Sequence, residues 1–228
     1  MPELPEVEAT RRRLDAWLAG QPIVAVHVAD ASSVRTGLTS RPSDAVSDPA
    51  AATRPWIGTV AGTPLRRGKR LGLRIGSSGL LAHLGMSGKW IRRAPGDPVP
   101  KFGRIGLEVP GRVAWFVDPR RFGCVTVCPA EAIDGALATG LGPDALLELP
   151  DGPGLAARFA VKRPIKIALL EQDRLAGLGN IHAVEALWRA RIHPDRRCDA
   201  LTAAEWAALS SAIGAQMTFA IADLGEDD

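Results

Sequence analysis

The chain has 228 residues, of which 46% are hydrophobic, enough for the core of one large domain or two small ones. Its 28 Lys and Arg against 25 Asp and Glu give a net charge of +3, which indicates nucleic acid only where the charge is clustered. No apolar run approaches the ~20 residues of a membrane span, and the acidic start argues against a signal peptide. We therefore expect a cytoplasmic protein with no membrane partner.

The three cysteines, Cys124, Cys128 and Cys198, form an odd and sparse set. Such a set argues against a disulfide framework, and no second pair completes a four-ligand metal site. We expect buried thiols and no metal.

The first part of the chain predicts one helix followed by short strands. Apolar residues at helical spacing predict a helix over residues 4–19, which Gly20 ends, and a strand follows over residues 22–28. Residues 29–55 are rich in Ser, Thr, Ala, Asp and Pro and indicate a long surface loop. Further strands are expected at residues 71–75, 80–84, 105–109, 112–117 and 124–127, with hairpin turns at 76–79 and 110–111.

The apolar spacing becomes helical after residues 140–143. Helices are expected at about residues 152–160, 165–173, 181–190 and 203–223, and the last opens with the capping-box pair Thr202 and Glu205. The fold class is therefore predicted as α+β. An antiparallel β-sandwich domain with an N-terminal helix, residues 1–140, precedes an all-α domain, residues 141–228, with a cleft expected between them.

The chain begins Met1-Pro2-Glu3-Leu4-Pro5-Glu6. If Met1 is removed, Pro2 presents a secondary amine, and a terminal amine titrates near pH ~8, so part of it is neutral and nucleophilic. Beside the carboxyl groups of Glu3 and Glu6, such an amine can form a Schiff base with a sugar aldehyde. The alternative is an ordinary helix start, because proline and acidic residues both suit the first turn.

Two segments have the chemistry of phosphate sites. Residues 66–74 are strongly basic, and Lys69 at the mouth of a strand suits a phosphate, although a solvated edge strand has the same composition. Residues 177–180, Gly-Leu-Gly-Asn, lead into a helix, and Asn180 as its N-cap would leave backbone N–H groups free for an anion. Lys166 lies just upstream. An ordinary Asn cap is the alternative.

Two turns carry apolar or aromatic residues that could enter a base stack. Met86 lies on a glycine-flanked turn, and residues 118–123 join Arg120 and Arg121 to Phe122. The alternatives are a core methionine, and a type I turn closed by Asp118 with Phe122 in the core. Residues 193–195, His-Pro-Asp, indicate a turn between helices, since no nucleophile accompanies them.

In their order along the chain, these motifs resemble the formamidopyrimidine-DNA glycosylase family, whose members excise 8-oxoguanine and ring-opened purines and nick the strand. The motifs are residues 2–8, Lys69, residues 83–88, residues 118–123 and residues 177–181. The resemblance covers nearly the whole chain and implies a helix-two-turn-helix domain in its second half. It also implies a monomeric, bifunctional glycosylase/AP lyase of base excision repair, acting on double-stranded DNA that contains oxidised bases or abasic sites.

The resemblance also implies roles for individual residues. Pro2 attacks C1′ of the damaged nucleotide, Glu3 acts as general acid and base, and Glu6 supports the active-site helix. Lys69 belongs to the catalytic set and holds a phosphate. The remaining DNA contacts are divided between phosphate binding, by Asn180, Lys166 and Arg121, and filling the gap left by the flipped base, by Met86, Arg120 and Phe122.

The sequence departs from the family pattern at several places. The family ends in a zinc finger with four cysteines, which we expect to be absent here, so no zinc or other cofactor is expected. Residues 101–104 lack the histidines often found there, and His182 stands where a tyrosine is common. Two alternatives stay open: a non-catalytic DNA-binding protein that retains the scaffold, and an enzyme for oxidised pyrimidines similar to endonuclease VIII. Leu4 and residues 6–8 resemble the oxidised-purine branch more.

Overall fold

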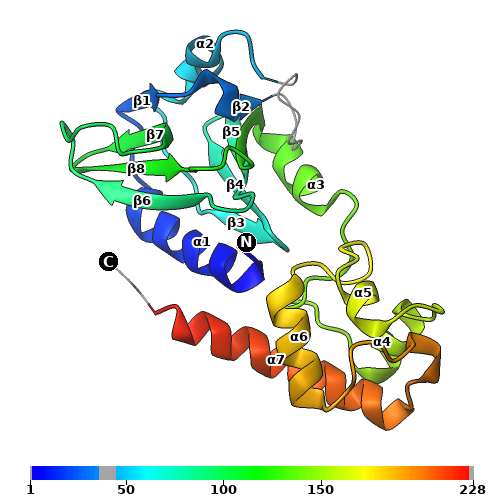
Figure 1. The fold of residues 1–228 in the computed structure, drawn as a ribbon. Helices are drawn as coiled ribbons and strands as arrows, with labels where there is room; N and C mark the ends of the chain where they lie inside the picture. Colours follow the sequence, from blue (N-terminus) through cyan, green and yellow to red (C-terminus); the bar gives the residue numbers. More distant parts are fainter. Residues whose placement is uncertain (1, 36–44, 226–228) are drawn as a thin grey trace.

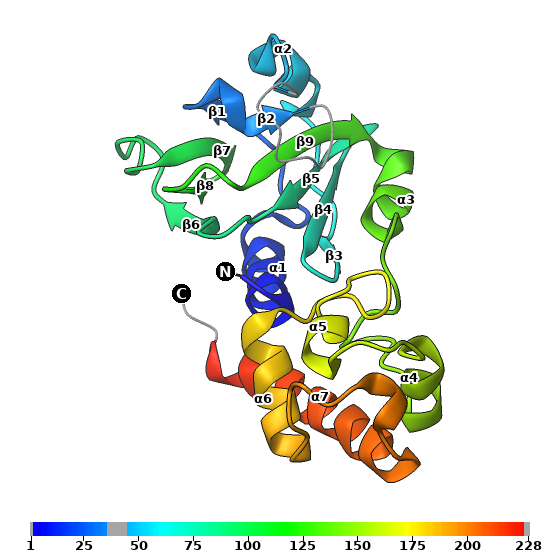
Figure 2. The same ribbon diagram turned by 45° about the vertical axis from the view of Figure 1, so that its right-hand side comes forward.

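The N-terminal helix α1 (Leu4–Leu18) lies where a β-rich half of the molecule meets a helical half (Figures 1 and 2). The structure, a computed structural model, describes residues 2–35 and 45–225. The helix expected over residues 4–19 is thus confirmed, and a turn at Ala19 and Gly20 ends it.

Two sheets form the β-rich half. The strands are β1 (Ala25–Val28), β2 (Val34–Arg35), β3 (Leu65–Arg67), β4 (Arg70–Ile75), β5 (Ser78–His83), β6 (Lys89–Arg93), β7 (Gly103–Val109), β8 (Arg112–Val117) and β9 (Cys124–Pro129). One sheet has the order β1-β7-β8-β6 and the other β2-β9-β5-β4-β3. Neighbouring strands are antiparallel except for β2 and β9, which are parallel. The predicted sandwich is confirmed, with this parallel pair as a correction.

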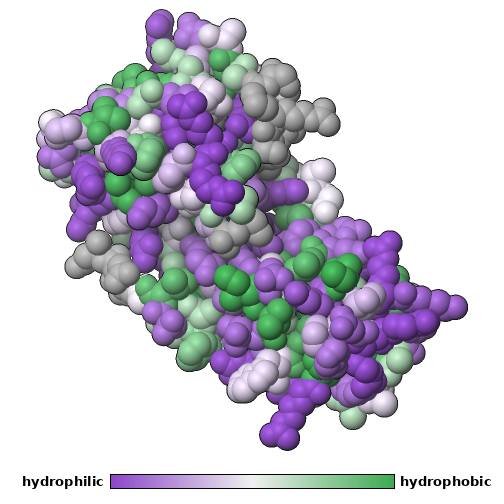
Figure 3. Space-filling view, in the orientation of Figure 1, coloured by the Kyte–Doolittle hydropathy of each residue, from purple (hydrophilic) through white to green (hydrophobic). Residues whose placement is uncertain are grey.

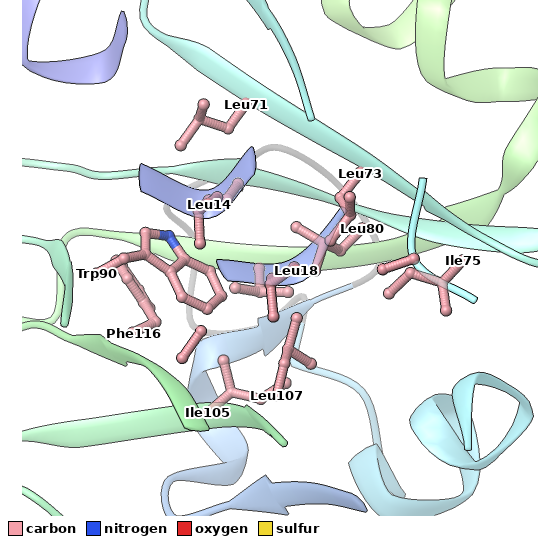
Figure 4. Close-up of a cluster of buried hydrophobic side chains, with 14 of the residues drawn as sticks. Leu14, Leu18, Leu71, Leu73, Ile75, Leu80, Trp90, Ile105, Leu107 and Phe116 are labelled. Atoms are coloured by element: carbon pink, nitrogen blue, oxygen red, sulfur yellow. The ribbon is translucent and has the colours of Figure 1, made fainter. Parts of the chain in front are cut away.

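The core of the β-rich half lies between its two sheets and includes one face of α1. Leu14 and Leu18 enter this core, with Leu73 of β4 on one side and Leu107 of β7 on the other (Figure 4). Each fully buried aliphatic side chain of this kind stabilises the fold by roughly 1.5–3 kcal/mol. The apolar stripe of α1 therefore fixes the helix against the sandwich and fixes the position of its N-terminal end.

The helical half has a core of its own. Its helices are α4 (Gly152–Arg158), α5 (Ile165–Leu169), α6 (Asn180–Ala190) and α7 (Ala203–Asp223), and α3 (Ile133–Ala138) precedes them after β9. The long helix α7 packs against α4, α6 and α1. Thr202 and Glu205 form the expected capping box. Leu4 of α1 is fully buried in this second core, so the first helix belongs to the packing of both halves.

The loop expected over residues 29–55 is only partly correct. It contains a 3-10 helix (Ala31–Ser33), β2, the short helix α2 (Pro49–Thr53) and a second 3-10 turn (Arg54–Trp56), while residues 36–44 lie outside the described part of the chain. The side chain of Asp48 caps α2, and Trp56 is fully buried with its Nε1–H donated to Ser78. Local capping and one buried aromatic thus order the described part of a segment that has little apolar periodicity.

Several other boundaries differ from those expected. The strand predicted over residues 22–28 is shorter, and β3, β6 and α3 were not predicted. In β6 only Trp90 is buried, so its alternation of apolar and polar residues is weak. No helix among the described residues is long and apolar enough to cross a membrane.

Candidate active site at the junction of the two halves

The carboxylate of Glu3 docks on the start of α6. It accepts hydrogen bonds from the backbone N–H groups of Gly179 at 2.7 Å, Ile181 at 2.9 Å and His182 at 3.2 Å. Glu3 is only 1% exposed, and the N–H of Leu4 donates to the carbonyl of Gly177 at 3.1 Å. The beginning of the chain is therefore tied to the helical half, and the half-buried Pro2 directly precedes this docked residue.

This docking corrects the expectation that Asn180 is the N-cap of α6 and leaves N–H groups free. The N-cap of α6 is Gly179, and Asn180 is the first, exposed residue of the helix. The N–H groups expected to be free for a phosphate are occupied by Glu3, whose negative charge suits the positive end of the helix.

Glycine is required where the two segments touch. A Cβ on residue 179 would lie 2.3 Å from Cδ of Glu3, and one on residue 177 would lie 2.3 Å from Cδ1 of Leu4. Residue 177 also has a φ of +115°, which L side chains rarely adopt. The Gly-Leu-Gly sequence is thus a docking surface for residues 3 and 4 rather than a flexible loop.

Glu6 and Lys69 complete the charged groups at this junction. Oε2 of Glu6 accepts the N–H of Glu3 at 2.8 Å. Burial raises the pKa of Glu6, but interactions with His182 and the N–H of Glu3 outweigh it, so the pKa lies below its ordinary value. Burial lowers the pKa of the Lys69 amine, and the charges of Glu3 and Glu6 oppose that effect. The charges of Glu3 and Glu6, at the start of α1, therefore act on the Lys69 amine.

Lys69 lies on a two-residue turn, Gly68–Lys69, between β3 and β4, and buried charges hold this turn. Asp144 accepts the N–H of Gly68 at 2.7 Å and a hydrogen bond from Nη1 of Arg66 at 2.6 Å. Nε of Arg66 donates to Glu8 of α1 at 3.0 Å. Burial raises the pKa of Asp144, but Arg66 outweighs this and lowers it. Three segments distant in sequence thus fix the position of Lys69.

The arginines of residues 66–74 make ion pairs and hydrogen bonds with other groups of the protein. Arg67 pairs with Glu148 at 2.8 Å, Arg70 donates to carbonyl groups of residues 136–139, and Arg74 pairs with Asp134. Neither a continuous phosphate-binding strip nor a solvated edge describes this segment. Within the described residues, Lys69 is the basic side chain of this run for which no hydrogen bond or ion pair is found.

Met86 and Phe122 are exposed, by 41% and 44%, so the alternatives that placed them in the core are wrong. The guanidinium of Arg120 lies 5.1 Å from the centroid of the Phe122 ring. A stacked arginine and phenylalanine next to an exposed methionine have the composition of a wedge for a base stack.

Asp118 holds the two turns that carry these side chains together. Its fully buried carboxylate accepts the Ser87 hydroxyl at 2.6 Å, the N–H of Arg120 at 3.2 Å and the N–H of Gly123 at 2.7 Å. Arg121 adopts a φ of +61°, and its Nε lies 3.4 Å from Asp30. Arg121 is therefore both exposed and paired.

The other sequence-predicted residues lie on the helical half. Lys166 is on α5, which packs against α6, and its backbone N–H donates to the carbonyl of Pro194 at 3.2 Å. His193 and Asp195 lie on an exposed turn between helices, as predicted. Across residues 2–35 and 45–225, no group of three or more His, Cys, Asp or Glu is arranged to hold a metal, and the three cysteines are free thiols.

Sequence reasoning missed Glu8, Asp144 and Gln216. Gln216 lies on α7 and contacts the buried His182, with Nε2 of Gln216 3.1 Å from Nδ1 of His182. Each of these residues acquires its role from a partner in a distant segment, so no local motif marks it. His182 was singled out only as a departure from the family pattern.

Two family models match the chain: the formamidopyrimidine-DNA glycosylase N-terminal domain over residues 1–125 and the formamidopyrimidine-DNA glycosylase H2TH domain over residues 141–226. The formamidopyrimidine-DNA glycosylase of Geobacter sulfurreducens is 35% identical over 98% of this chain and 79% of its own length. The protein of that name from Gloeobacter violaceus is 37% identical over 99% of this chain and 78% of its own length.

Solved structures agree with these matches. The Lactococcus lactis enzyme bound non-covalently to DNA with an AP site has a TM-score of 0.84 at 27% identity, covering 97% of this chain and 82% of its own. MutM in complex with DNA containing carbocyclic 8-oxo-G also has a TM-score of 0.84, at 28% identity, covering 97% of this chain and 80% of its own. The chain whose first helix docks Glu3 on a Gly-Leu-Gly turn belongs to the formamidopyrimidine-DNA glycosylase family.

Proposed function

We propose that this protein is a bifunctional DNA glycosylase/AP lyase of base excision repair that excises oxidised purines, such as 8-oxoguanine and formamidopyrimidines. The observation that carries the proposal is the docking of Glu3 on the start of α6, where three backbone N–H groups hold its carboxylate. This arrangement holds the residue after the candidate nucleophile in a buried and fully hydrogen-bonded position. Such preorganisation is what covalent catalysis by a terminal amine requires.

The proposed reaction begins once Met1 has been removed. The neutral amine of Pro2 attacks C1′, the C1′–N bond breaks, and the base leaves with the bonding electron pair and a proton. Opening of the sugar ring then gives a Schiff base between Pro2 and C1′. This cation acidifies C2′, so that loss of a proton expels the 3′ phosphate, and a second elimination expels the 5′ phosphate. Glu3 is the group assigned to the proton transfers.

DNA binding in this proposal uses two sets of side chains. Lys69, Asn180, Lys166 and Arg121 contact phosphates, and Met86, Arg120 and Phe122 fill the space that the flipped nucleotide leaves. Base flipping costs roughly a few kcal/mol of stacking, and a stacked wedge offsets part of it. The exposure of Met86 and Phe122 supports their assignment.

The proposal also covers the substrate, the oligomeric state, the cellular location and the domain division. The substrate is double-stranded DNA with oxidised bases or abasic sites, the protein acts as a monomer without a cofactor, and it works in the bacterial cytosol, where the DNA lies. We also propose a division into domains 1–140 and 141–228. Two separate hydrophobic clusters support this division, although Leu4 packs in the second cluster.

Borohydride trapping tests the activity. The protein, with Met1 removal verified by mass spectrometry, should become covalently linked to a duplex with an abasic site or 8-oxoguanine, and Pro2→Thr should abolish the product. Binding without trapping would instead support the non-catalytic alternative. Comparing excision of 8-oxoguanine with excision of thymine glycol separates the oxidised-purine branch from the endonuclease VIII branch.

A further inference from the structure

A series of polar side chains leads from Arg189, exposed on α6, through Gln216 of α7 to Glu6 in the candidate site. Nε of Arg189 donates to Oε1 of Gln216 at 2.8 Å, and Nε2 of Gln216 lies 3.1 Å from Nδ1 of His182. Nε2 of His182 lies 3.6 Å from Oε1 of Glu6 and has no hydrogen-bond partner. These contacts join α6, α7 and α1, and His182 is only 5% exposed.

The donor groups fix the direction of the hydrogen bonds in this series of side chains. A guanidinium can only donate, so the amide oxygen of Gln216 must face Arg189 and its NH₂ group must face His182. Nδ1 of His182 is therefore an acceptor and carries no proton. The ring proton lies on Nε2, which faces Glu6. Arg189 also lies 5.1 Å from the centroid of the Phe219 ring on α7.

Glu6 links His182 to Glu3, the residue beside the candidate nucleophile. Its other carboxylate oxygen, Oε2, accepts the N–H of Glu3 at 2.8 Å. Resting on the proposed function, we propose that His182 is a positioning residue, whose Nε2–H directs the Glu6 carboxylate and through it orients Glu3 and the amine of Pro2 for attack on C1′.

Charged groups from each packed segment surround Glu6. Glu3 lies on the same segment, His182 comes from α6, and burial lowers the pKa of Lys69, on the β3–β4 turn, against the opposing effect of the charges of both acids. Burial raises the pKa of Glu6, and contact with His182 is the strongest effect that lowers it. Removing the Nε2–H should therefore raise this pKa, and the acidic limb of the trapping rate should move to higher pH.

Two variants of His182 separate the two ring nitrogens. In His182→Gln the amide nitrogen can take the place of Nε2, whereas in His182→Asn the amide reaches only the place of Nδ1. We expect His182→Asn to slow single-turnover trapping on abasic DNA by at least about tenfold and to shift the acidic limb upward. His182→Gln should stay within about threefold of the unchanged protein. All variants should bind a duplex with a tetrahydrofuran site equally, and His193→Asn on the exposed turn is the control.

The proposal is overturned if both His182 variants fold, bind DNA and trap at the rate and pH dependence of the unchanged protein. A second measurement does not depend on activity. Nitrogen NMR of the His182 ring should show a proton on Nε2 and none on Nδ1, and a proton on Nδ1 would overturn the proposed relay. Failure of the unchanged protein to trap would refute the proposed function and, with it, the positioning of Pro2. The expected ring protonation would in that case establish only the order of hydrogen bonds from Arg189 to His182.

Discussion

The carboxylate of Glu3 and the backbone of Gly179 are 176 positions apart in sequence and joined by a 2.7 Å hydrogen bond. The contact places the beginning of the chain on the end of a helix from the other half of the molecule (Figure 2). Any relative movement of the halves would strain this contact. The position of Pro2 thus depends on the packing between the halves, in which the buried Leu4 also takes part.

Gly179→Ala should disrupt this docking. The added Cβ would lie 2.3 Å from Cδ of Glu3, so the carboxylate must move away from the N–H groups of α6. We expect a loss of about 1–3 kcal/mol in the free energy of unfolding and a large loss of borohydride trapping. Denaturant unfolding and the trapping assay measure the two effects.

Gly135→Ala provides the matched control, because nothing lies within 4 Å of the added Cβ and the residue is in the helix α3. It should keep trapping unchanged and raise the free energy of unfolding by up to about 1 kcal/mol. Normal trapping by folded Gly179→Ala would show that the docking of Glu3 is dispensable.

Asp144→Asn should weaken the clamp on the Lys69 turn and change stability at low pH. The folded-state pKa of Asp144 lies below its unfolded value of about 3.9, so its stabilising effect is present above that pH and is lost as the pH falls through the folded pKa. At neutral pH the variant leaves the buried Arg66 partly uncompensated, and we expect a loss of about 3 kcal/mol in the free energy of unfolding.

Urea unfolding of both proteins between pH 7 and pH 2 measures this effect. The difference should be constant at neutral pH and should shrink below pH about 4. Asp134→Asn is the control, because its ion pair with Arg74 is exposed and should contribute about 0–1 kcal/mol. A difference that persists unchanged at pH 2 would contradict the assignment.

The comparison of sequence and structure shows which features have local causes. The helix starting at Leu4 and the strands β4, β5, β7, β8 and β9 followed from apolar periodicity, because each is set by which face it buries. The ion pair of Arg66 could not be predicted in this way, because its partner Asp144 is 78 positions away. Residue composition alone cannot separate an arginine that binds DNA from one that joins two segments.

In the candidate site, too, contacts between distant segments could not be predicted from local sequence. The motif containing Asn180 was recognised, but the N–H groups beside it are taken by Glu3, which only the fold reveals. Exposure of Met86 and Phe122 likewise could not be decided from sequence, since apolar residues on turns are often buried. Figure 3 shows one face of the molecule, and on it hydrophobic residues lie among hydrophilic ones in both the β-rich and the helical half. Exposed apolar residues are therefore not confined to Met86 and Phe122.

Lys69→Met should reveal one phosphate contact. If Lys69 holds a phosphate, log Kd for a tetrahydrofuran duplex should change less steeply with log salt, with the slope reduced by about 1. Lys89→Met is the control, because Lys89 is exposed on β6 and has no role in the proposed site. Fluorescence anisotropy at several salt concentrations gives the slopes. Equal slopes for the unchanged protein and Lys69→Met would show that Lys69 does not bind a phosphate. Its interaction with the charges of Glu3 and Glu6 would then be its remaining role.

Phe122→Ala should separate base flipping from sugar chemistry. Stacking by an aromatic ring is worth about 1–3 kcal/mol, so excision from a duplex with a paired 8-oxoguanine should slow by about tenfold or more. Trapping on a preformed abasic site should slow much less, because no stacked base has to be removed. Leu147→Ala is the control, since Leu147 is 71% exposed, precedes α4 and is not among the residues assigned to DNA contact. Equal slowing on both substrates would mean that Phe122 acts in binding rather than in filling the gap.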